Sequence, residues 1–331
     1  MSDTTSHFHD ARVLITGGLG FIGSNLARRL ADLGARVTLL DSLVPEYGGN
    51  LFNIAGYEDR LRVNIGDMRD EHGIAHLVQG QQYIFNLAGQ VSHLDSMRDP
   101  FTDLEINCRS QLYLLEACRK HNPTVRIVYA STRQVYGKPK SLPVTEDHPL
   151  APADINGIHK QAGGWYHILY HRVYGLRTTS LRLTNTYGPR MRVVDARQTF
   201  LGLWLRQLIS GEELLVYGDG HQKRDFNFVD DAVDALLLAA AHPEAEGEIY
   251  NLGSREIITL RDLAQLLITL NSSGAWHCAP FPTDRKAIDI GDYYGDYNRI
   301  QRAIGWQPAV SLRDGLARTL DYYRACRAHY W

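Results

Sequence analysis

Short apolar runs alternate with amphipathic stretches along the first half of the chain. Ile22, Leu26 and Leu30 recur at the spacing of one helix face. Similar spacing predicts further helices over residues 102–120 and 157–174. The runs between the helices are rich in Val, Ile, Leu and Thr, and they predict strands over residues 12–16, 36–40, 62–65, 83–87, 126–130 and 178–183. Because strands and helices alternate, we predict an α/β fold with a doubly wound parallel sheet and helices on both faces.

The pattern changes after Tyr187, where Pro189, Gly211 and Gly218 separate shorter elements. Residues 273–295 are rich in proline and aspartate, and we expect a loop with little regular structure there. These changes predict two regions. The larger comprises residues 1–186, with 225–254 returning to it, and the smaller is a C-terminal α/β substrate-binding region of residues 187–224 and 255–331.

Composition narrows the class of protein. The chain has 331 residues, 44% of them hydrophobic, and a net charge of −2, which excludes a disordered chain and gives no basic excess for nucleic acid. No apolar run approaches the roughly 20 residues that span a bilayer. Four cysteines are scattered without C-x-x-C spacing, which predicts neither a disulfide scaffold nor a metal site. We therefore expect a cytoplasmic protein with reduced thiols and no bound metal.

A glycine-rich loop joins the first predicted strand to the first predicted helix. Gly17 permits the tight turn, Gly20 lets the backbone approach a pyrophosphate, and Gly23 lets helix and strand pack closely. The helix N-terminus then offers free N–H groups to the phosphates. Asp41 ends the next strand, where a carboxylate binds a ribose 2′-hydroxyl and repels a 2′-phosphate. The loop therefore predicts NAD as the cofactor.

Further motifs follow in a fixed order. They are TGGLGFIG at 16–23, GDM at 66–68, NLAG at 86–89, YASTRQVYG at 129–137, RLTNTYGPR at 182–190, and VYGDG at 216–220 followed by RDF at 224–226. In this order they resemble the extended short-chain dehydrogenases/reductases, the NAD-dependent nucleotide-sugar epimerases and dehydratases, from residue 13 to 323. The resemblance implies a Rossmann-like fold. It implies NAD contacts from Gly17, Gly20, Phe21, Ile22, Gly23, Asp41, Asp67, Met68, Leu87, Ala88, Gly89, Gln90, Asn107, Lys160 and Thr184.

The resemblance also implies a binding site for a nucleotide sugar, which we expect to be UDP-linked. Asn185 matches the asparagine that meets the diphosphate, and Tyr217 matches an aromatic residue that stacks on the base. Guanidinium groups suit a diphosphate because each can donate two hydrogen bonds. The residues expected to bind substrate are Asn185, Arg190, Gln198, Thr199, Tyr217, Arg224 and Arg285.

The expected catalytic residues depart from the family pattern. The resemblance gives Thr132 the role of the catalytic serine or threonine and Lys160 that of the lysine that holds the nicotinamide ribose. Four residues before this lysine, where the family has a catalytic tyrosine, the chain has Asn156. An amide does not titrate near neutral pH, so Asn156 cannot be a general base.

Three explanations for this departure stay open. Another group supplies the base, with His159 the first candidate and Tyr166 and Tyr136 the next. Alternatively, Thr132 and a water relay suffice. In the third explanation catalysis is lost, and the protein binds a nucleotide sugar without converting it.

The residues after Thr132 bear on the reaction. Family 4,6-dehydratases carry an Asp-Glu pair there, whereas this chain has Arg133 and Gln134, which cannot act as a carboxylic acid or a carboxylate base. We therefore predict an epimerase that oxidises a sugar hydroxyl transiently. The alternative function is that of an enzyme similar to UDP-glucuronate decarboxylases. In that case Arg190 and Arg192 would hold the uronate carboxylate by paired hydrogen bonds.

An excess of apolar and aromatic residues on the two long helices bears on assembly. In the family that this chain resembles, these helices pair as a four-helix bundle. We therefore expect a homodimer.

Overall fold

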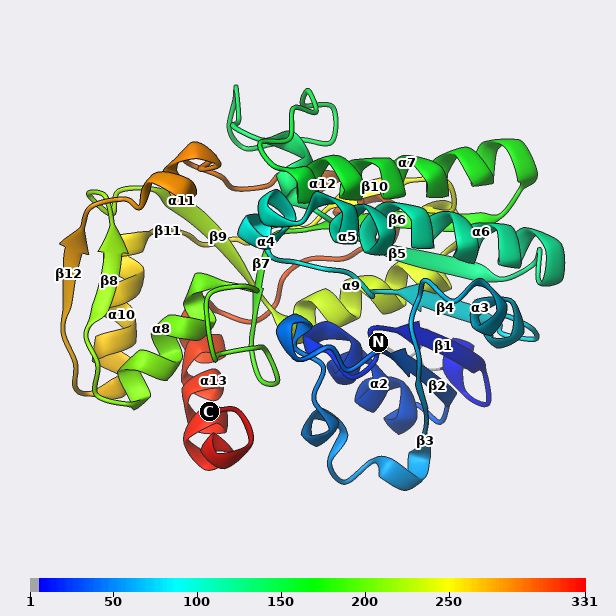
Figure 1. The fold of residues 1–331 in the computed structure, drawn as a ribbon, viewed down its shortest axis with the longest axis horizontal. Helices are drawn as coiled ribbons and strands as arrows, with labels where there is room; N and C mark the ends of the chain where they lie inside the picture. The colour runs from blue at the N-terminus through cyan, green and yellow to red at the C-terminus, as the bar shows by residue number, and fades with distance from the viewer. Residues whose placement is uncertain (1–5) are drawn as a thin grey trace.

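Seven parallel strands form the central sheet of the computed structural model, which describes residues 6–331 (Figure 1). All six predicted strands are present, each within two residues of its expected bounds. A seventh strand extends the sheet beside β6. In spatial order the strands are β10 (Ile249–Asn251), β6 (Arg177–Leu183), β5 (Arg126–Thr132), β4 (Tyr83–Asn86), β1 (Arg12–Thr16), β2 (Arg36–Asp41) and β3 (Leu61–Ile65). The predicted Rossmann-like α/β fold is thereby confirmed.

Successive side chains of each strand point to opposite faces of the sheet, and both faces are apolar. Val13 and Ile15 belong to a core shared with helices α2 and α9, whereas Leu14 belongs to a second core shared with α3, α6 and α7. Figure 1 shows these helices on opposite sides of the sheet. Their bounds are α2 (Phe21–Asp32), α3 (Glu71–Leu77), α6 (Ser110–His121), α7 (Ile155–Tyr174) and α9 (Val229–Ala241).

The helix predicted over residues 102–120 is interrupted. The chain forms α5 (Pro100–Leu104), a π-helical turn over Glu105–Arg109, and then α6. Just before α5 lies α4 (His93–Arg98). No helix in the part of the chain that the structure describes is long and apolar enough to cross a membrane.

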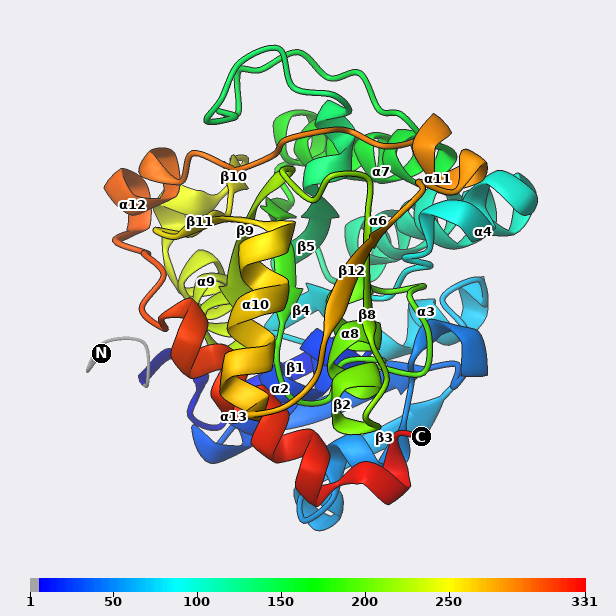
Figure 2. The same ribbon diagram turned by 90° about the vertical axis from the view of Figure 1, so that its left-hand side faces the viewer.

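The smaller region is built from two small sheets and flanking helices (Figure 2). β7 (Asn185–Tyr187), β9 (Lys223–Phe228) and β11 (Ile257–Thr259) form one sheet, and β8 (Leu214–Tyr217) and β12 (Trp276–Ala279) form the other. Its helices are α8 (Phe200–Ile209), α10 (Leu260–Asn271), α11 (Thr283–Ala287), α12 (Asn298–Ile304) and α13 (Leu312–Ala325).

One expectation about this region was wrong. The segment 273–295 was expected to be loop, yet it contains β12 and α11. β12 pairs in parallel with β8, from Trp276 opposite Leu214 to Ala279 opposite Tyr217. This pairing satisfies backbone groups of β8 that would otherwise be an open edge, and local sequence does not reveal it.

The division into two regions stays a prediction, although several contacts bear on it. β10 joins the central sheet and α9 packs against α2, so most of 225–254 does lie with the larger region. β9 pairs with β7 outside the central sheet. The first five residues of the larger region lie outside the described residues.

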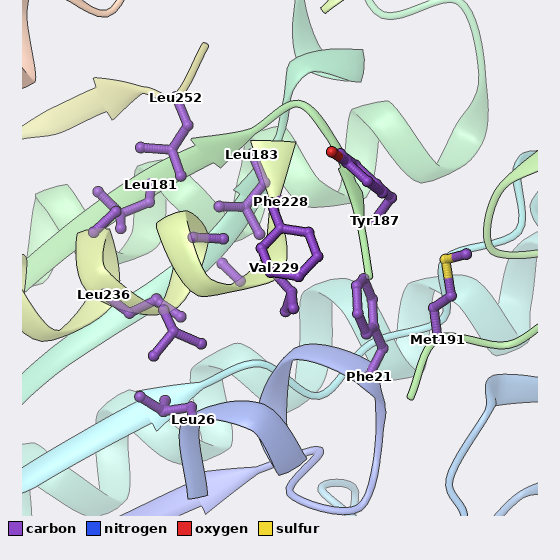
Figure 3. Close-up of a cluster of buried hydrophobic side chains, with 14 of the residues drawn as sticks. Phe21, Leu26, Leu181, Leu183, Tyr187, Met191, Phe228, Val229, Leu236 and Leu252 are labelled. Atoms are coloured by element: carbon purple, nitrogen blue, oxygen red, sulfur yellow. The ribbon is translucent and has the colours of Figure 1, made fainter. Parts of the chain in front are cut away.

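A buried apolar cluster joins the two regions beneath the site (Figure 3). Phe21 at the start of α2 lies in one core with Tyr187 and Met191, which follow β6, and with Val229 at the start of α9. The N-terminus of α2 is therefore held rigidly against the chain that enters the smaller region.

Candidate active site

A cleft of about 840 Å³ lies between the carboxyl ends of the central strands and the smaller region. Ligands of open α/β sheets bind at this edge, and the volume is that of a small-molecule site. The predicted residues that line the cleft are Gly17, Gly20, Phe21, Ile22, Gly23, Asp41, Asp67, Met68, Leu87, Ala88, Gly89, Thr132, Asn156, Lys160, Thr184, Asn185, Gln198, Thr199, Tyr217, Arg224 and Arg285. Four other predicted residues are absent from its described lining: Gln90, Asn107, His159 and Arg190.

The glycine loop has the geometry that a pyrophosphate requires. Gly17 has φ +68°, and a Cβ on Gly23 would lie 2.1 Å from the Gly17 carbonyl oxygen. A Cβ on Gly20 would meet only that oxygen within 4 Å, at 3.2 Å, among the described atoms. Within the described chain no side chain caps α2 at Gly20, so its first-turn N–H groups face the cleft.

Asp41 lies at the end of β2, beside the loop. Its Oδ2 accepts the Leu19 N–H at 3.0 Å and its Oδ1 accepts the Leu43 N–H at 2.9 Å. Burial raises the pKa of Asp41, and these backbone N–H groups oppose the rise. The carboxylate is thus held at the cleft wall, where a ribose is expected.

The opposite end of the dinucleotide site is formed by Gly89, Asn107 and Lys160. An ideal Cβ on Gly89 would lie 2.7 Å from Asn107 Oδ1 and 2.8 Å from Lys160 Nζ, so any larger residue would have to displace these two side chains. Lys160 Nζ donates to the Ala130 carbonyl at 3.2 Å, and burial lowers the pKa of Lys160 to about 8. Oδ1 of Asn107 is buried and has no partner within residues 6–331. These residues fit the nicotinamide half of NAD.

Asn156 belongs to a buried polar network centred on Asp103, which sequence reasoning missed. Nδ2 of Asn156 donates to the Gln90 carbonyl at 2.8 Å and to Asp103 Oδ2 at 3.2 Å. Nδ2 of Asn107 donates to the same two acceptors, at 2.9 and 3.0 Å. His159 Nδ1 lies 2.7 Å from Asp103 Oδ1. His159 therefore contacts this network rather than the described lining of the cleft.

The two tyrosines considered as bases are also outside the described lining of the cleft. The Tyr136 hydroxyl donates to Asn251 Oδ1 at 2.6 Å in a buried cluster. The Tyr166 hydroxyl lies 3.7 Å from Cys108 Sγ. Their positions offer no support for a role as base.

The end of β5 and the turn after it bring Thr132, Arg133 and Gln134 to the cleft. Thr132 Oγ1 accepts the Gln134 N–H at 3.3 Å, and Arg133 Nη2 donates to Asn185 Oδ1 at 2.9 Å. Nη1 of Arg133 is buried without a hydrogen-bond partner in the described structure, and burial lowers the pKa of Arg133. A buried guanidinium with a free N–H is a strong site for an anionic group.

The far end of the cleft has aromatic and basic groups. The Arg285 guanidinium lies 5.7 Å from the centre of the Tyr217 ring. Burial, and next the charge of Arg133, lower the pKa of Arg224 to about 10, although Asp289 lies 3.7 Å from its Nη2. The base-stacking and diphosphate-binding positions predicted from the sequence therefore lie on one wall.

Arg190 and Arg192 lie elsewhere. Arg190 Nη1 donates to Asn25 Oδ1 at 2.7 Å, and its guanidinium lies 5.3 Å from the centre of the Tyr322 ring. Arg192 makes two hydrogen bonds to Asp195, at 3.0 and 2.7 Å. In the structure as described neither lines the cleft, so their positions do not support the expected contacts with substrate or with a uronate carboxylate.

A second pair in the cleft was also missed. His93, at the first position of α4, lines the cleft, and its Nδ1 lies 2.8 Å from Oδ2 of the buried Asp154. The only sequence signal is that Asp154 precedes a helix as a cap would; its pairing with a histidine 61 positions earlier leaves no local pattern. Among the described residues, no three His, Cys, Asp or Glu side chains are grouped to hold a metal ion.

Comparison with known proteins identifies the family. The model of the "NAD dependent epimerase/dehydratase family" matches residues 13–253. A dTDP-glucose 4,6-dehydratase from Streptomyces niveus is 32% identical over 97% of this chain and 94% of its own length. A UDP-glucose 4-epimerase from Mycolicibacterium smegmatis is 32% identical over 95% and 98%.

A solved structure extends the comparison to the fold. The dTDP-glucose 4,6-dehydratase from Streptomyces venezuelae, with NAD bound, superposes with a TM-score of 0.86 at 32% identity, covering 96% of this chain and 98% of that one. The similar proteins thus include both dehydratases and epimerases. With its glycine loop, Asp41 and the Lys160 site, this chain belongs to the NAD-dependent epimerase/dehydratase family of nucleotide-sugar enzymes, the extended short-chain dehydrogenases/reductases, whose cofactor is NAD.

Proposed function

We propose that this chain is an epimerase of a UDP-sugar, which inverts one sugar carbon by transient oxidation of its hydroxyl. The observation that carries the proposal is the turn after Thr132, where Arg133 and Gln134 line the cleft. Elimination of water by the acid–base pair of the 4,6-dehydratases needs a carboxylic acid and a carboxylate, and these two side chains supply neither. Oxidation and re-reduction at a single carbon need no such pair.

In this proposal the residues of the cleft have separate roles in binding and in the reaction. NAD, when bound, accepts a hydride from the sugar carbon and later returns it. Thr132 hydrogen-bonds the reacting hydroxyl, and Lys160 holds the nicotinamide ribose. Because burial lowers the pKa of Lys160 only to about 8, this side chain stays mostly protonated at neutral pH, and its charge favours the alkoxide form of the reacting hydroxyl. Tyr217 stacks on the base, and Arg224 and Arg285 bind the diphosphate.

A second candidate reaction, decarboxylation of a UDP-uronate, is favoured by Arg133. Its Nη1 is buried without a partner among the described residues, one position after Thr132. A sugar carboxylate would give this free N–H a charged acceptor, whereas a neutral sugar would not. Oxidation at C4 makes a β-keto acid, which loses carbon dioxide readily.

The test is to incubate the NAD-loaded protein in D₂O with nucleotide hexoses and nucleotide uronates, followed by mass-resolved chromatography. We expect a product of unchanged mass and new retention time, without carbon-bound deuterium because the hydride returns from the cofactor. Loss of water would overturn the proposal in favour of a dehydratase, and loss of carbon dioxide would establish the decarboxylase. No conversion of any substrate would favour a nucleotide-sugar binding protein.

Two variants sharpen the result. Thr132→Val, which removes the hydroxyl at nearly constant volume, should lower kcat on the order of 100-fold. Arg133→Met should weaken the binding of a nucleotide uronate about 10- to 100-fold, the value of a charged hydrogen bond. The loss should be smaller for a neutral nucleotide hexose, on which Arg133 acts only through Asn185.

A further inference from the structure

His93 lines the cleft although no motif predicts it. Ser92 caps α4 by accepting the Asp95 N–H at 3.1 Å, which fixes His93 at the first helical position. Its side chain is 32% exposed and lines the cleft. His93 is therefore a titratable group that a ligand in the cleft can reach.

Asp154 holds the opposite side of this ring. Its side chain is only 2% exposed, and its Oδ2 lies 2.8 Å from His93 Nδ1, an ion-pair distance at which the ring N–H does not point along a hydrogen bond. Its Oδ1 accepts the Gly157 N–H at 2.6 Å and thereby caps α7, the helix that carries Asn156 and Lys160. The Asp–His pair is thus built into the same helix start as the lysine site.

The protonation of this pair follows from its surroundings. Burial would raise the pKa of Asp154, but pairing with His93, the Gly157 N–H and the charge of Arg133 outweigh it and lower this pKa. The charge of an ionised Asp154 2.8 Å from Nδ1 favours the tautomer with the proton on Nδ1, which leaves the lone pair on Nε2. That Nε2 lies 3.0 Å from Gln134 Nε2, which can donate to it.

Gln134 connects this lone pair with the predicted catalytic threonine. Its backbone N–H donates to Thr132 Oγ1 and its side chain contacts His93 Nε2. Both Thr132 and His93 line the cleft, whereas Nδ1 of His159 faces Asp103, outside the described lining. The Asn156 amide donates its hydrogen bonds to Gln90 and Asp103. Of these side chains, His93 alone combines a titratable acceptor with access to the cleft beside Thr132.

We propose that His93 is the general base of this protein and that Asp154 is its positioning residue. The proposal rests on the proposed function. The sugar hydroxyl displaces the Gln134 amide and gives its proton to His93 Nε2, while the hydride of the same carbon passes to the nicotinamide of NAD and the C=O bond forms. In the return step the hydride adds to the other face of the carbonyl carbon, and His93 Nε2 gives its proton back to the oxygen.

Variants of the NAD-loaded enzyme test the base. General bases contribute on the order of 100- to 10,000-fold, so His93→Gln should lower kcat at least about 100-fold. Its affinity for UDP, measured by calorimetry, should stay within about 3-fold, since the ring contacts no expected diphosphate group. Free imidazole should restore part of the activity to His93→Ala, which a structural role would not explain. His76→Gln, on the exposed face of α3, is the control.

Asp154→Asn separates the charge from the helix cap. Asparagine caps helices as well as aspartate, so α7 should keep its start while the carboxylate is lost. We expect kcat to fall about 10-fold or more, because the imidazole loses its fixed tautomer. The nitrogen-15 signals of His93, identified by their loss in His93→Gln, should show a proton on Nδ1 in the wild type and a mixture of tautomers in Asp154→Asn.

The outcomes separate this proposal from the proposed function. A wild type that converts no nucleotide sugar refutes the proposed function, and the base with it. An active wild type with an equally active His93→Gln variant refutes the base alone. So does a proton on Nε2 of neutral His93, or a loss of kcat confined to His159→Gln.

Discussion

Asn156 donates its side-chain N–H to Oδ2 of Asp103 over 3.2 Å, and both residues are buried. Asn156 is thus a structural donor in a network with Gln90 and Asn107. This network lies directly beneath Gly89 and Lys160, where the nicotinamide half of NAD fits. The Asn156 amide is therefore held by buried hydrogen bonds next to the expected cofactor site.

Asn156→Ala should lower the free energy of unfolding by about 1–3 kcal/mol, because the Gln90 carbonyl and the Asp103 carboxylate each lose a buried donor. Urea unfolding of the NAD-free protein measures this change. A variant as stable as the wild type would show that the network contributes little.

Asn156→Asp is the matched variant, since it keeps the size but adds a carboxyl group beside Asp103. Two adjacent carboxylates raise the pKa of one of them above the unfolded value of about 3.9. The unfolded chain then releases this proton more easily, so the variant should lose stability relative to Asn156→Ala as pH rises from about 4 to 7. A difference between the two variants that is independent of pH would contradict this account.

Lys160 should destabilise the NAD-free protein. Burial lowers its pKa from 10.5 to about 8, which corresponds to as much as about 3 kcal/mol at neutral pH. Lys160→Met should therefore unfold at a higher urea concentration than the wild type at neutral pH. The gain in the free energy of unfolding is reduced by the loss of the hydrogen bond to the Ala130 carbonyl. The affinity of the variant for NAD should fall.

The contribution of Lys160 to the stability of the folded protein depends on pH in a definite direction. Between the folded pKa of about 8 and the ordinary lysine pKa of 10.5, the unfolded chain binds the Lys160 proton more tightly than the folded chain. Stability due to this group therefore rises with pH across that window, and the advantage of Lys160→Met should shrink there. Urea unfolding of both proteins at neutral pH and at about pH 9.5 checks this. If the stability difference between Lys160→Met and the wild type stayed the same or grew at the higher pH, burial of a charged Lys160 would not be its cause.

Much of the fold follows from local sequence. The β-branched runs and the spacing of Ile22, Leu26 and Leu30 are satisfied by one sheet and one helix, so periodicity alone locates them. The π-helical turn at Glu105–Arg109 and the strand β12 depend on packing and pairing with distant segments, which no local pattern records.

The site also has features that local motifs predict and features that depend on contacts between distant residues. Motif order brought most of the predicted residues to one cleft, because glycines and strand ends have fixed positions in this fold. The pairing of His93 with Asp154 joins residues more than 50 positions apart, and so do the contacts of Asp103 with Asn156 and His159. Arg190 matches its motif yet packs on Asn25, since a motif gives the backbone position and not the side-chain direction.

Two glycines of the cofactor loop should respond differently to alanine. In Gly23→Ala the Cβ would lie 2.1 Å from the Gly17 carbonyl oxygen, so backbone must move, and we expect a loss of about 1–3 kcal/mol in stability as well as weaker NAD binding. In Gly20→Ala the corresponding distance is 3.2 Å, and the added methyl group lies where the pyrophosphate approaches.

Gly20→Ala should therefore cost less than about 1 kcal/mol in stability but about 10-fold or more in NAD affinity. Urea unfolding and calorimetric titration with NAD separate the two effects. Equal losses of stability in both variants would show that the Gly23 contact is relieved by a shift of the loop.

The predicted homodimer can be tested on α7. Ile158, Trp165, Leu169 and Val173 are exposed at the spacing of one helix face, and Phe101 on the neighbouring α5 is 77% exposed. Exposed apolar stripes of this kind are typical of interfaces. We expect the wild type to sediment as a dimer at micromolar concentration and Leu169→Glu to sediment as a monomer, because a dimer would bury the new charge. Leu51→Glu, at another exposed leucine, should remain a dimer. A monomeric wild type, or a dimeric Leu169→Glu, would place the interface elsewhere or exclude it.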